Sequence, residues 1–123
     1  MEFQKLTPML STNQLKETID FYTNKLGFSL VAGDELGWAA IQRGNVELMF
    51  TLPNQHIPFD KPVYTGSFYI NVDDVDQIWT ELKDVVKIVY DIENFDYGMR
   101  EFAIYDNNGY IIQFGQDIGE IDN

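Results

Sequence analysis

The chain has 123 residues, and 20 Asp and Glu against 8 Lys and Arg give it a formal net charge of −12. A surface this acidic repels the phosphate backbone of nucleic acids, so nucleic-acid binding is not expected. The sequence contains no cysteine, which excludes disulfides, thiolate metal sites and a cysteine nucleophile.

No segment is apolar over the roughly 20 residues that are needed to span a bilayer. The first ten residues, MEFQKLTPML, lack the basic region and apolar stretch of a signal peptide. A cytoplasmic protein without a membrane partner is therefore expected. Hydrophobic residues make up 45% and charged residues 23%, a balance that is typical of a single globular domain over 1–123. Aromatic residues make up 15%, and they fit either a well-packed core or the lining of a ligand pocket.

The first half of the sequence predicts one strand, one helix and three more strands. The first strand is expected over 3–10, and the Ser11-Thr12-Asn13 segment offers side chains that cap helix N-termini. A helix follows, because Leu15, Ile19 and Tyr22 share one helical face, and Gly27 is expected to end it. Three strands are then predicted, over 28–32, 38–42 and 46–52. The last two are joined by Arg43-Gly44-Asn45, which suits a tight hairpin turn.

The second half repeats this order after a loop. Residues 53–62 hold three of the four prolines and the only histidine, His56, so 53–64 is predicted as a linker. A strand is expected over 67–72, and Asp73 and Asp74 favour the start of a helix. This helix carries an apolar stripe of Val75, Ile78, Trp79 and Leu82. Three strands are predicted after it, over 86–90, 99–105 and 110–115.

The two halves therefore form an internal βαβββ repeat. Leu15 and Val75 take the same place in the two helices, and the segments RGNVELMF and NNGYIIQF match as the last hairpins. Each half is too small to bury its own sheet, so the halves are expected to share a core. The predicted fold is α+β, with modules over 3–52 and 65–116 whose curved mixed sheets surround a cavity. Residues 117–123 are predicted to form an acidic tail.

Three segments carry a resemblance to a known family. QLKETIDFYTNKLGF resembles the first helix and strand of the vicinal oxygen chelate superfamily, which includes glyoxalase I, extradiol dioxygenases, fosfomycin-resistance transferases and bleomycin-resistance proteins. GWAAIQRGNVELMF and YGMREFAIYDNNGYIIQFGQ resemble most closely the bleomycin-resistance branch. The sequence departs from that pattern at Asn107 and Tyr110, where Pro and Asn are usual. The resemblance implies the tandem-module fold and a homodimer.

Enzymes of the superfamily hold a divalent metal with side chains from the first and last strands of each module, commonly His, Gln and Glu. The corresponding positions here are Thr7, Ser67, Gln113, and either Met49 or, after a shift of register, Glu47. Thr, Ser and Met are poor donors to such a cation, and His56 lies in the proline-rich loop. No metal and no cofactor are therefore predicted, although a weak site that uses Glu47, His56 or Gln113 stays open. Gln113 is interpreted as a position where a metal-binding carboxylate is absent, or as a satisfied polar residue inside a cavity.

No catalytic residue is predicted. Ser67 has no histidine base, since His56 is the only histidine, and Asp73 and Asp74 fit helix capping better than acid–base chemistry. Glu101 alternates on a strand and is expected to face solvent or a dimer partner. Arg100 is expected to pair with a carboxylate.

The resemblance implies a non-enzymatic homodimer that buries a large, often cationic, antibiotic in crevices at the dimer interface. Apolar and aromatic walls supply burial and stacking, and the negative charge speeds encounter with a basic ligand. For each aromatic ring the alternative is core packing, and Trp79, on the helical stripe, is assigned to the core. The predicted ligand-binding residues are Trp38, Met49, Phe59, Ser67, Tyr69, Tyr97 and Gln113.

Two alternatives stay open. The first is a metal-dependent lyase or dioxygenase of the same superfamily with an atypical site. The second is a homodimer that binds a different small ligand, such as a metabolite or another antibiotic. Metal content distinguishes the first alternative, and titration with a cationic ligand distinguishes the second.

Overall fold

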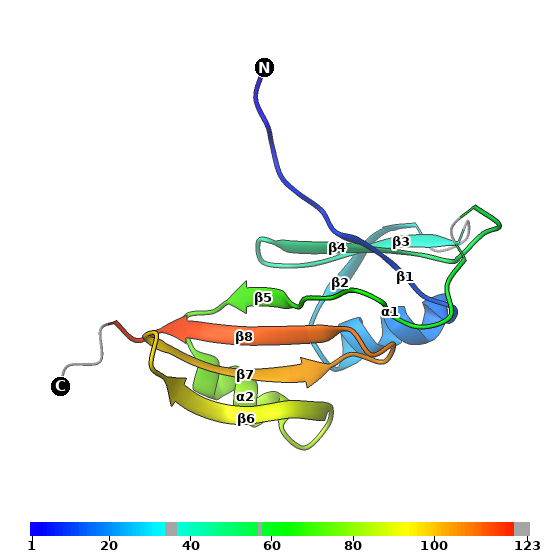
Figure 1. Ribbon diagram of the computed structural model, residues 1–123. Helices are drawn as coiled ribbons and strands as arrows, with labels where there is room; N and C mark the ends of the chain where they lie inside the picture. The colour runs from blue at the N-terminus through cyan, green and yellow to red at the C-terminus, as the bar shows by residue number, and fades with distance from the viewer. Residues whose placement is uncertain (34–36, 57, 120–123) are drawn as a thin grey trace. The chain divides into compact units, whose positions relative to one another are not determined.

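Each half of the chain forms a four-stranded sheet with one helix on it (Figure 1). The computed structural model describes residues 1–33, 37–56 and 58–119. Within it the chain divides into two units, Met1–Pro62 and Val63–Asn123. Both sheets are mixed, because in each one the first strand runs parallel to the last while the other neighbours are antiparallel. The predicted α+β fold with tandem βαβββ order is confirmed.

The first sheet has the order β1-β4-β3-β2. Its strands are β1 (Met9–Ser11), β2 (Ser29–Gly33), β3 (Trp38–Arg43) and β4 (Val46–Thr51). Helix α1 (Leu15–Asn24) packs on β2 and β3, as its apolar face requires. Tyr22 of α1 is fully buried, and its ring lies against the rings of Phe28 and Phe50. The turn between β3 and β4 is the predicted one, and Gly44 supplies the positive φ of 58° that it needs.

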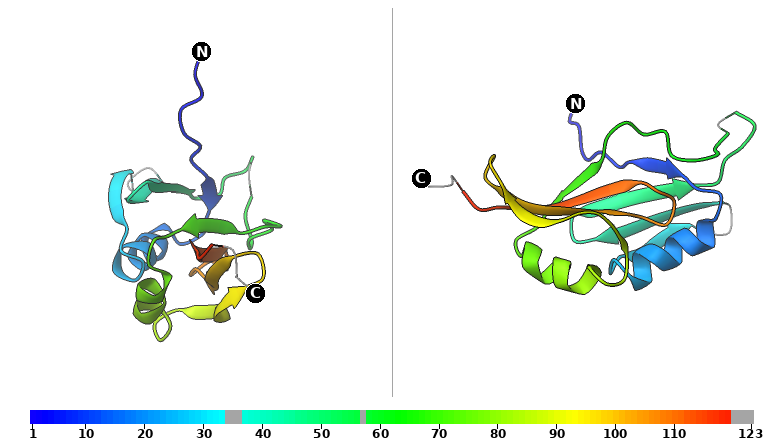
Figure 2. Two further views of the ribbon diagram at one scale, coloured as in Figure 1. Left: turned by 90° about the vertical axis from the view of Figure 1, so that its left-hand side faces the viewer. Right: turned by 60° about the horizontal axis from the view of Figure 1, so that its bottom comes forward.

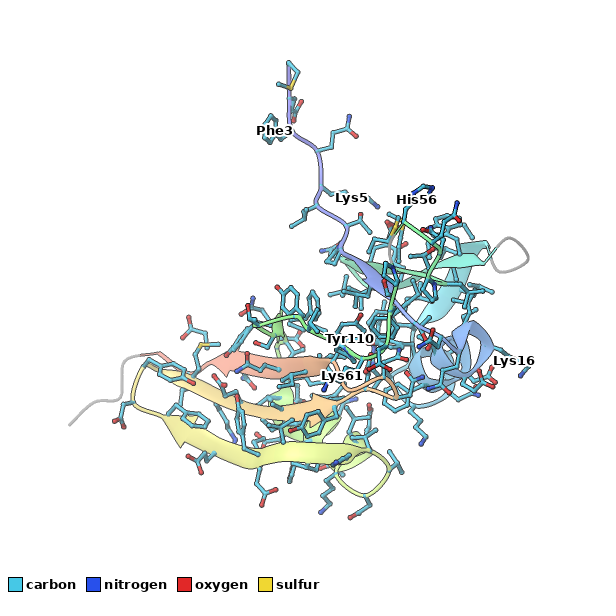
Figure 3. All side chains as sticks on the ribbon, turned by 45° about the vertical axis from the view of Figure 1, so that its right-hand side comes forward. Phe3, Lys5, Lys16, His56, Lys61 and Tyr110 are labelled. Atoms are coloured by element: carbon cyan, nitrogen blue, oxygen red, sulfur yellow. The ribbon has the colours of Figure 1, made fainter. Side chains whose placement is uncertain are left out.

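The first strand is shorter than the sequence predicts. The prediction of a strand over 3–10 is wrong for residues 3–8, because β1 begins only at Met9. Pro8 has no N–H to give to a strand ladder, although its carbonyl still accepts a bond from the N–H of Met49. Before it the chain is extended but unpaired, and Phe3 and Leu6 are 87% and 89% exposed. Figure 3 shows Phe3 and Lys5 on this N-terminal segment.

The predicted cap of the first helix is also wrong. The N-cap residue is Gln14, and its side chain makes no capping hydrogen bond. Thr12 contributes instead from two positions earlier, since its fully buried hydroxyl accepts a bond from the N–H of Gln14 and pairs with the hydroxyl of Thr18. The Thr12 hydroxyl thus serves the helix start without occupying the N-cap position. The helix ends at Asn24, before the expected Gly27.

The second sheet has the order β5-β8-β7-β6. Its strands are β5 (Phe68–Asn71), β6 (Lys87–Phe95), β7 (Met99–Tyr105) and β8 (Ile111–Asp117). Helix α2 (Val75–Leu82) lies along one face of this sheet (Figure 2). Trp79 packs edge-on against Phe102 of β7, with 5.0 Å between ring centroids. Asp74 caps α2 as predicted, by accepting the N–H of Gln77 at 3.2 Å.

The turn between β7 and β8 is organised by one carboxylate. Asp106 is 6% exposed, and its Oδ1 accepts the backbone N–H groups of Asn108, Gly109 and Tyr110, each at 2.9 Å. The two strands that this turn joins pair in a register that places Ala103 opposite Gln113 and Glu101 opposite Gly115. This register decides which side chains of β7 and β8 meet on the face of the sheet away from α2.

Several predicted boundaries shift. Strand β6 extends to Phe95 rather than ending at residue 90. Asp117, expected in an acidic tail, is the last residue of β8, and residues 120–123 of that tail lie outside the described part. The predicted linker over 53–64 contains no helix or strand among its described residues, which exclude Ile57. No helix in the described ranges is long and apolar enough to cross a membrane.

Candidate functional site

The second sheet has one face covered by α2 and one face that carries polar and aromatic side chains. Side chains alternate between the two faces along a strand, so Phe102, which contacts Trp79 of α2, and Glu101 point to opposite sides. The register aligns Tyr69, Gln113, Ala103 and Tyr90 across all four strands on the side of Glu101. This face brings together polar side chains from every strand of the sheet.

Glu101 lies at the centre of this face and is fully buried, with 0% exposure. The prediction that it faces solvent is therefore wrong, and the alternative that it faces a dimer partner stays a prediction. Its Oε1 accepts hydrogen bonds from the hydroxyls of Tyr69, at 2.8 Å, and Tyr97, at 2.7 Å. Its Oε2 accepts the hydroxyl of Tyr90 and, at 3.1 Å, the amide of Gln113. Four donors thus replace the water that a buried carboxylate loses.

These donors hold Glu101 in its ionised form. Burial is the largest single influence on its pKa and raises it. The hydrogen bonds from Tyr90, Tyr97, Tyr69 and Gln113 together lower the pKa by more, so that it lies below the ordinary value of 4.5. At neutral pH the site therefore holds a buried negative charge.

The same contacts keep the tyrosines protonated. Loss of hydration, followed by the hydrogen bond to Glu101, raises the pKa of Tyr90 and of Tyr97 to about 12. Loss of hydration and the same carboxylate raise the pKa of Tyr69 well above its ordinary value of 10.0. All three phenols are neutral donors at physiological pH.

Gln113 links this carboxylate to Ser67. Its amide Nε2 donates to the Tyr90 hydroxyl at 2.8 Å as well as to Glu101, and its Oε1 accepts the Ser67 hydroxyl. Its amide oxygen and nitrogen are both used, so Gln113 orients a hydrogen-bonded network of side chains. We call Ser67, Tyr69, Tyr90, Tyr97, Glu101 and Gln113 the Glu101 cluster.

Aromatic rings continue the cluster along the sheet. Tyr97 stacks on Phe95, with centroids 5.5 Å apart and an interplanar angle of 13°, and Phe95 meets Tyr90 edge-on. Tyr69 and Tyr97 stay 39% and 65% exposed, although their hydroxyls reach the buried carboxylate. The cluster therefore presents ring surface outward and a negative charge inward.

The predicted ligand-binding residues belong to both units. Ser67, Tyr69, Tyr97 and Gln113 meet in the Glu101 cluster of the second unit. Trp38 and Met49 meet in the first unit, where the indole Nε1 donates to the Met49 sulfur at 3.2 Å. Phe59, also in the first unit, is half-buried, and its carbonyl accepts a bond from Asn13.

Three members of this face were not predicted as site residues: Tyr90, Phe95 and Glu101. One signal in the sequence could have identified Glu101. It is the only carboxylate on a largely apolar strand, residues 99–105. Tyr90 and Phe95 lie on β6, and the predicted end of this strand at residue 90 left Phe95 outside it.

A family model matches residues 6–114, and it describes the glyoxalase/bleomycin resistance protein/dioxygenase superfamily. The match covers both sheets and both helices. The chain belongs to this superfamily. The expectation from the sequence segments is thereby confirmed at the level of the family.

Sequence and structure comparisons agree with this membership. An uncharacterized protein of Mycolicibacterium smegmatis is 36% identical over 105 residues, which are 82% of this chain and 83% of that protein. A crystal structure of a bleomycin resistance determinant encoded on transposon Tn5 is 25% identical, with a TM-score of 0.75 over 94% of this chain and 98% of that one. A bleomycin-binding protein in complex with bleomycin is 25% identical, with a TM-score of 0.73 over 93% and 98%.

The positions that bind metal in enzymes of the superfamily carry unsuitable side chains here. In the first unit the Thr7 hydroxyl donates to Glu47 at 3.3 Å, and Lys5 pairs with the same carboxylate at 3.0 Å. In the second unit Ser67 and Gln113 bond to each other. One lysine-paired carboxylate, two hydroxyls and an amide do not fit the donor set of a divalent metal.

His56 does not complete such a set. It lies on the loop between β4 and β5 and not on a strand (Figure 3). No group of three or more His, Cys, Asp or Glu side chains is arranged to hold a metal ion among residues 1–33, 37–56 and 58–119.

Proposed function

We propose that this chain is a non-catalytic binding protein of the superfamily that sequesters a small aromatic molecule, an antibiotic or a metabolite. In this proposal the protein is a homodimer and the ligand occupies a crevice at the dimer interface. The observation that carries the proposal is the Glu101 cluster with its outward-facing rings of Tyr69 and Tyr97. These rings have no structural need to be exposed on a sheet face, and covering them with a planar ligand is favourable.

Burial and stacking of aromatic rings can supply the free energy that such binding needs. An aromatic ring that leaves water gains about 25 cal/mol per Å² of buried apolar surface, and stacking adds to this gain. Phe95 holds Tyr97 in a stacked position before any ligand arrives, so less conformational entropy is lost on binding. Likeness to a bleomycin-binding protein and to a bleomycin resistance determinant, each 25% identical, supports the same class of function.

The alternative, a metal-dependent lyase or dioxygenase, receives less support from the side chains. The superfamily includes such enzymes, but a metal-dependent reaction needs three or four nitrogen or oxygen donors that converge on one point. Thr7 and Ser67 offer hydroxyls, Gln113 offers an amide that is already bonded on both sides, and Glu47 is paired with Lys5.

A titration with metal-free bleomycin tests the proposal. The purified protein is titrated at low and moderate salt while tryptophan fluorescence is followed, and divalent metal content is measured on the same preparation. Saturation near one ligand per chain, with little bound metal, is the expected result. Trp38→Phe assigns the signal, because Trp79 packs against Phe102 on the covered face of the sheet.

Two results would count against the proposal. A flat titration at tens of micromolar removes bleomycin as the ligand and moves the question to a panel of planar aromatic compounds. Stoichiometric divalent metal, together with no binding across that panel, contradicts sequestration and favours the metal-dependent alternative. Sedimentation analysis tests the homodimer separately.

A further inference from the structure

We infer that the Glu101 cluster is a subsite for a protonated amine, amidine or guanidine on the bound molecule, an inference that rests on the proposed function. The starting point is the charge balance of the second sheet. Glu101 is ionised and 0% exposed, and its four partners are three neutral phenols and a neutral amide.

No Lys or Arg within the described part of the second unit, residues 63–119, forms an ion pair with this carboxylate. All eight Lys and Arg and the single His lie in the described ranges, and their ion pairs are elsewhere. Those pairs are Lys5 with Glu47, Lys16 with Asp20, and Arg100 with Asp76. Arg100 is adjacent to Glu101 in sequence but points to the opposite face, where it meets the helix α2 residue Asp76.

The other basic residues are also engaged or exposed. Arg43 donates to the carbonyl of Leu26, and Lys25 and Lys87 lie over the rings of Phe21 and Tyr105. Lys61 and Lys83 are exposed. Burying a carboxylate without a cation costs free energy even when the carboxylate is fully hydrogen-bonded. A cationic group on a ligand would therefore be attracted to this site electrostatically.

Tyr69 and Tyr97 connect the buried charge of Glu101 to the surface of the protein. A phenolic hydroxyl has one hydrogen, and Tyr69 and Tyr97 both donate theirs to Glu101. The lone pairs of the two hydroxyl oxygens can therefore accept a hydrogen bond from a ligand. A hydroxyl that donates to a carboxylate becomes a better acceptor, because hydrogen bonds in a chain polarise one another. An N–H group of the ligand, bonded to Tyr97, would therefore sense the charge of Glu101 through that hydroxyl.

This geometry selects among ligands. The faces of the exposed tyrosine rings attract cations, and the negative net charge of the chain raises their local concentration. An anion is repelled by the same features. A cation that carries N–H donors gains both the ring contact and the bond to a phenol oxygen, whereas a quaternary ammonium gains only the first.

Three naphthalene probes of one shape and different charge test the subsite by isothermal titration calorimetry. The probes are 2-naphthylmethylamine, 2-naphthylmethanol and 2-naphthoate, measured at pH 7. The amine is expected to bind about tenfold more tightly than the alcohol, and the carboxylate most weakly. Glu101→Gln keeps the size of the side chain and removes its charge, and it is expected to abolish the preference for the amine.

Tyr97→Phe provides a second variant, which keeps the Glu101 carboxylate and removes one of its four hydrogen-bond donors. It keeps the ring on Phe95, removes the relaying hydroxyl, and is expected to lower amine affinity several-fold while leaving the alcohol unchanged. Tyr64→Phe is the matched control, because Tyr64 is exposed and stacked on Phe68 but has no bond to Glu101. The control is expected to bind all three probes as the native protein does.

The outcomes separate the two proposals. Equal affinity for amine and alcohol overturns the cation subsite while leaving aromatic sequestration standing. No saturable binding of any probe contradicts both. If Glu101→Gln does not fold, Tyr97→Phe decides, and an unchanged amine preference in that folded variant overturns the subsite.

Discussion

The Tyr69 hydroxyl reaches Oε1 of Glu101 at 2.8 Å by passing over a position that has no side chain. That position is Gly115, which pairs with Glu101 across β7 and β8. A Cβ on residue 115 would lie 1.9 Å from the Tyr69 oxygen and 2.5 Å from the ring carbon that bears it. Backbone conformation does not require glycine here. The close approach of the phenol does.

Gly115→Ala is expected to displace Tyr69 and to break its bond to the buried carboxylate. A loss of about 2 kcal/mol in the free energy of unfolding is expected, because a hydrogen bond to a charged group is lost and the ring must move. Urea denaturation measures the loss. In a Tyr69→Ala background the same substitution has nothing to displace, so the two changes are expected to be strongly non-additive. Additive losses would show that Gly115 matters for another reason.

Glu101→Gln is expected to lower the free energy of unfolding by roughly 2 kcal/mol at pH 7, since charge-assisted bonds become neutral ones. The pKa of Glu101 is lower in the folded than in the unfolded state, so its ionisation contributes stability above about 4.5, the unfolded value. That contribution is lost as the pH falls through the folded pKa.

The difference in the free energy of unfolding between the native protein and Glu101→Gln should therefore decrease as the pH is lowered. Urea denaturation of both proteins from pH 7 down to pH 3 measures this, and the other carboxylates cancel in the difference because both proteins share them. A difference that grows at low pH would mean that Glu101 is protonated in the folded protein.

Alkaline titration is expected to show tyrosines that ionise late. The pKa of Tyr90 and Tyr97 is about 12, and that of Tyr69 is raised as well, against an ordinary value of 10.0. Because these pKa values are raised by folding, the stability they contribute is complete below pH 10 and is lost as the pH rises through 12. Absorbance of tyrosinate at 295 nm follows the seven tyrosines, and Tyr97→Phe should remove one late-titrating group. If the variant instead lacks one of the tyrosines that titrate near the ordinary value, Tyr97 does not hold its bond to Glu101 in solution.

Much of the fold follows from local signals in the sequence. The helical stripes, the Gly44 turn, the Asp74 cap and the proline-rich loop all depend on residues within one or two turns of each other, and the structure has them as predicted. The two wrong assignments, the strand over 3–8 and the cap of α1, fail through longer-range effects. Residues 3–8 find no partner strand, and the Thr12 hydroxyl is shared with Thr18.

The candidate site was only half predictable for the same reason. Strand alternation assigns Glu101 to the face opposite Phe102 but does not say what covers that face. The donors that bury and satisfy its carboxylate come from Tyr69, 32 positions away, and from Tyr90 and Gln113 on two other strands. Register, which is set by the pairing of whole strands, decides these contacts. Ser67, Tyr69, Tyr97 and Gln113 were selected one by one, and only the structure shows that the last three donate to one carboxylate while Ser67 donates to Gln113.

Tyr97→Ala and Trp38→Ala are expected to weaken bleomycin binding more than they weaken the fold. Tyr97 is 65% exposed but donates to the buried Glu101, so its truncation should cost about 1.5 kcal/mol in the free energy of unfolding and lower the affinity about 100-fold, or about 2.8 kcal/mol. Trp38 is half-buried and bonded to Met49, so its truncation should cost more, about 2 kcal/mol. Fluorescence titration and urea denaturation are measured on the same samples. If both variants lose several kcal/mol of stability and bind as before, the rings belong to the core.

Asp106→Ala is expected to do the reverse, with a loss of stability and no loss of binding by the folded protein. Asp106 is 6% exposed, and its Oδ1 accepts three backbone N–H groups of the β7–β8 turn. The substitution removes this shared acceptor, although the N–H of Gly109 keeps its bond to the backbone carbonyl of residue 106. A cost of about 2 kcal/mol in the free energy of unfolding follows, to be measured by urea denaturation. Asp106→Asn keeps an oxygen in the same place and should cost less than half as much. If the asparagine variant is as unstable as the alanine one, the negative charge of Asp106 stabilises the turn, and the position of its oxygen does not. Native amine affinity is expected in the folded variants, because the pairing of β7 with β8 along their whole length holds Gln113 and Gly115 in place. A loss of that affinity would show that the turn is also needed to hold the register.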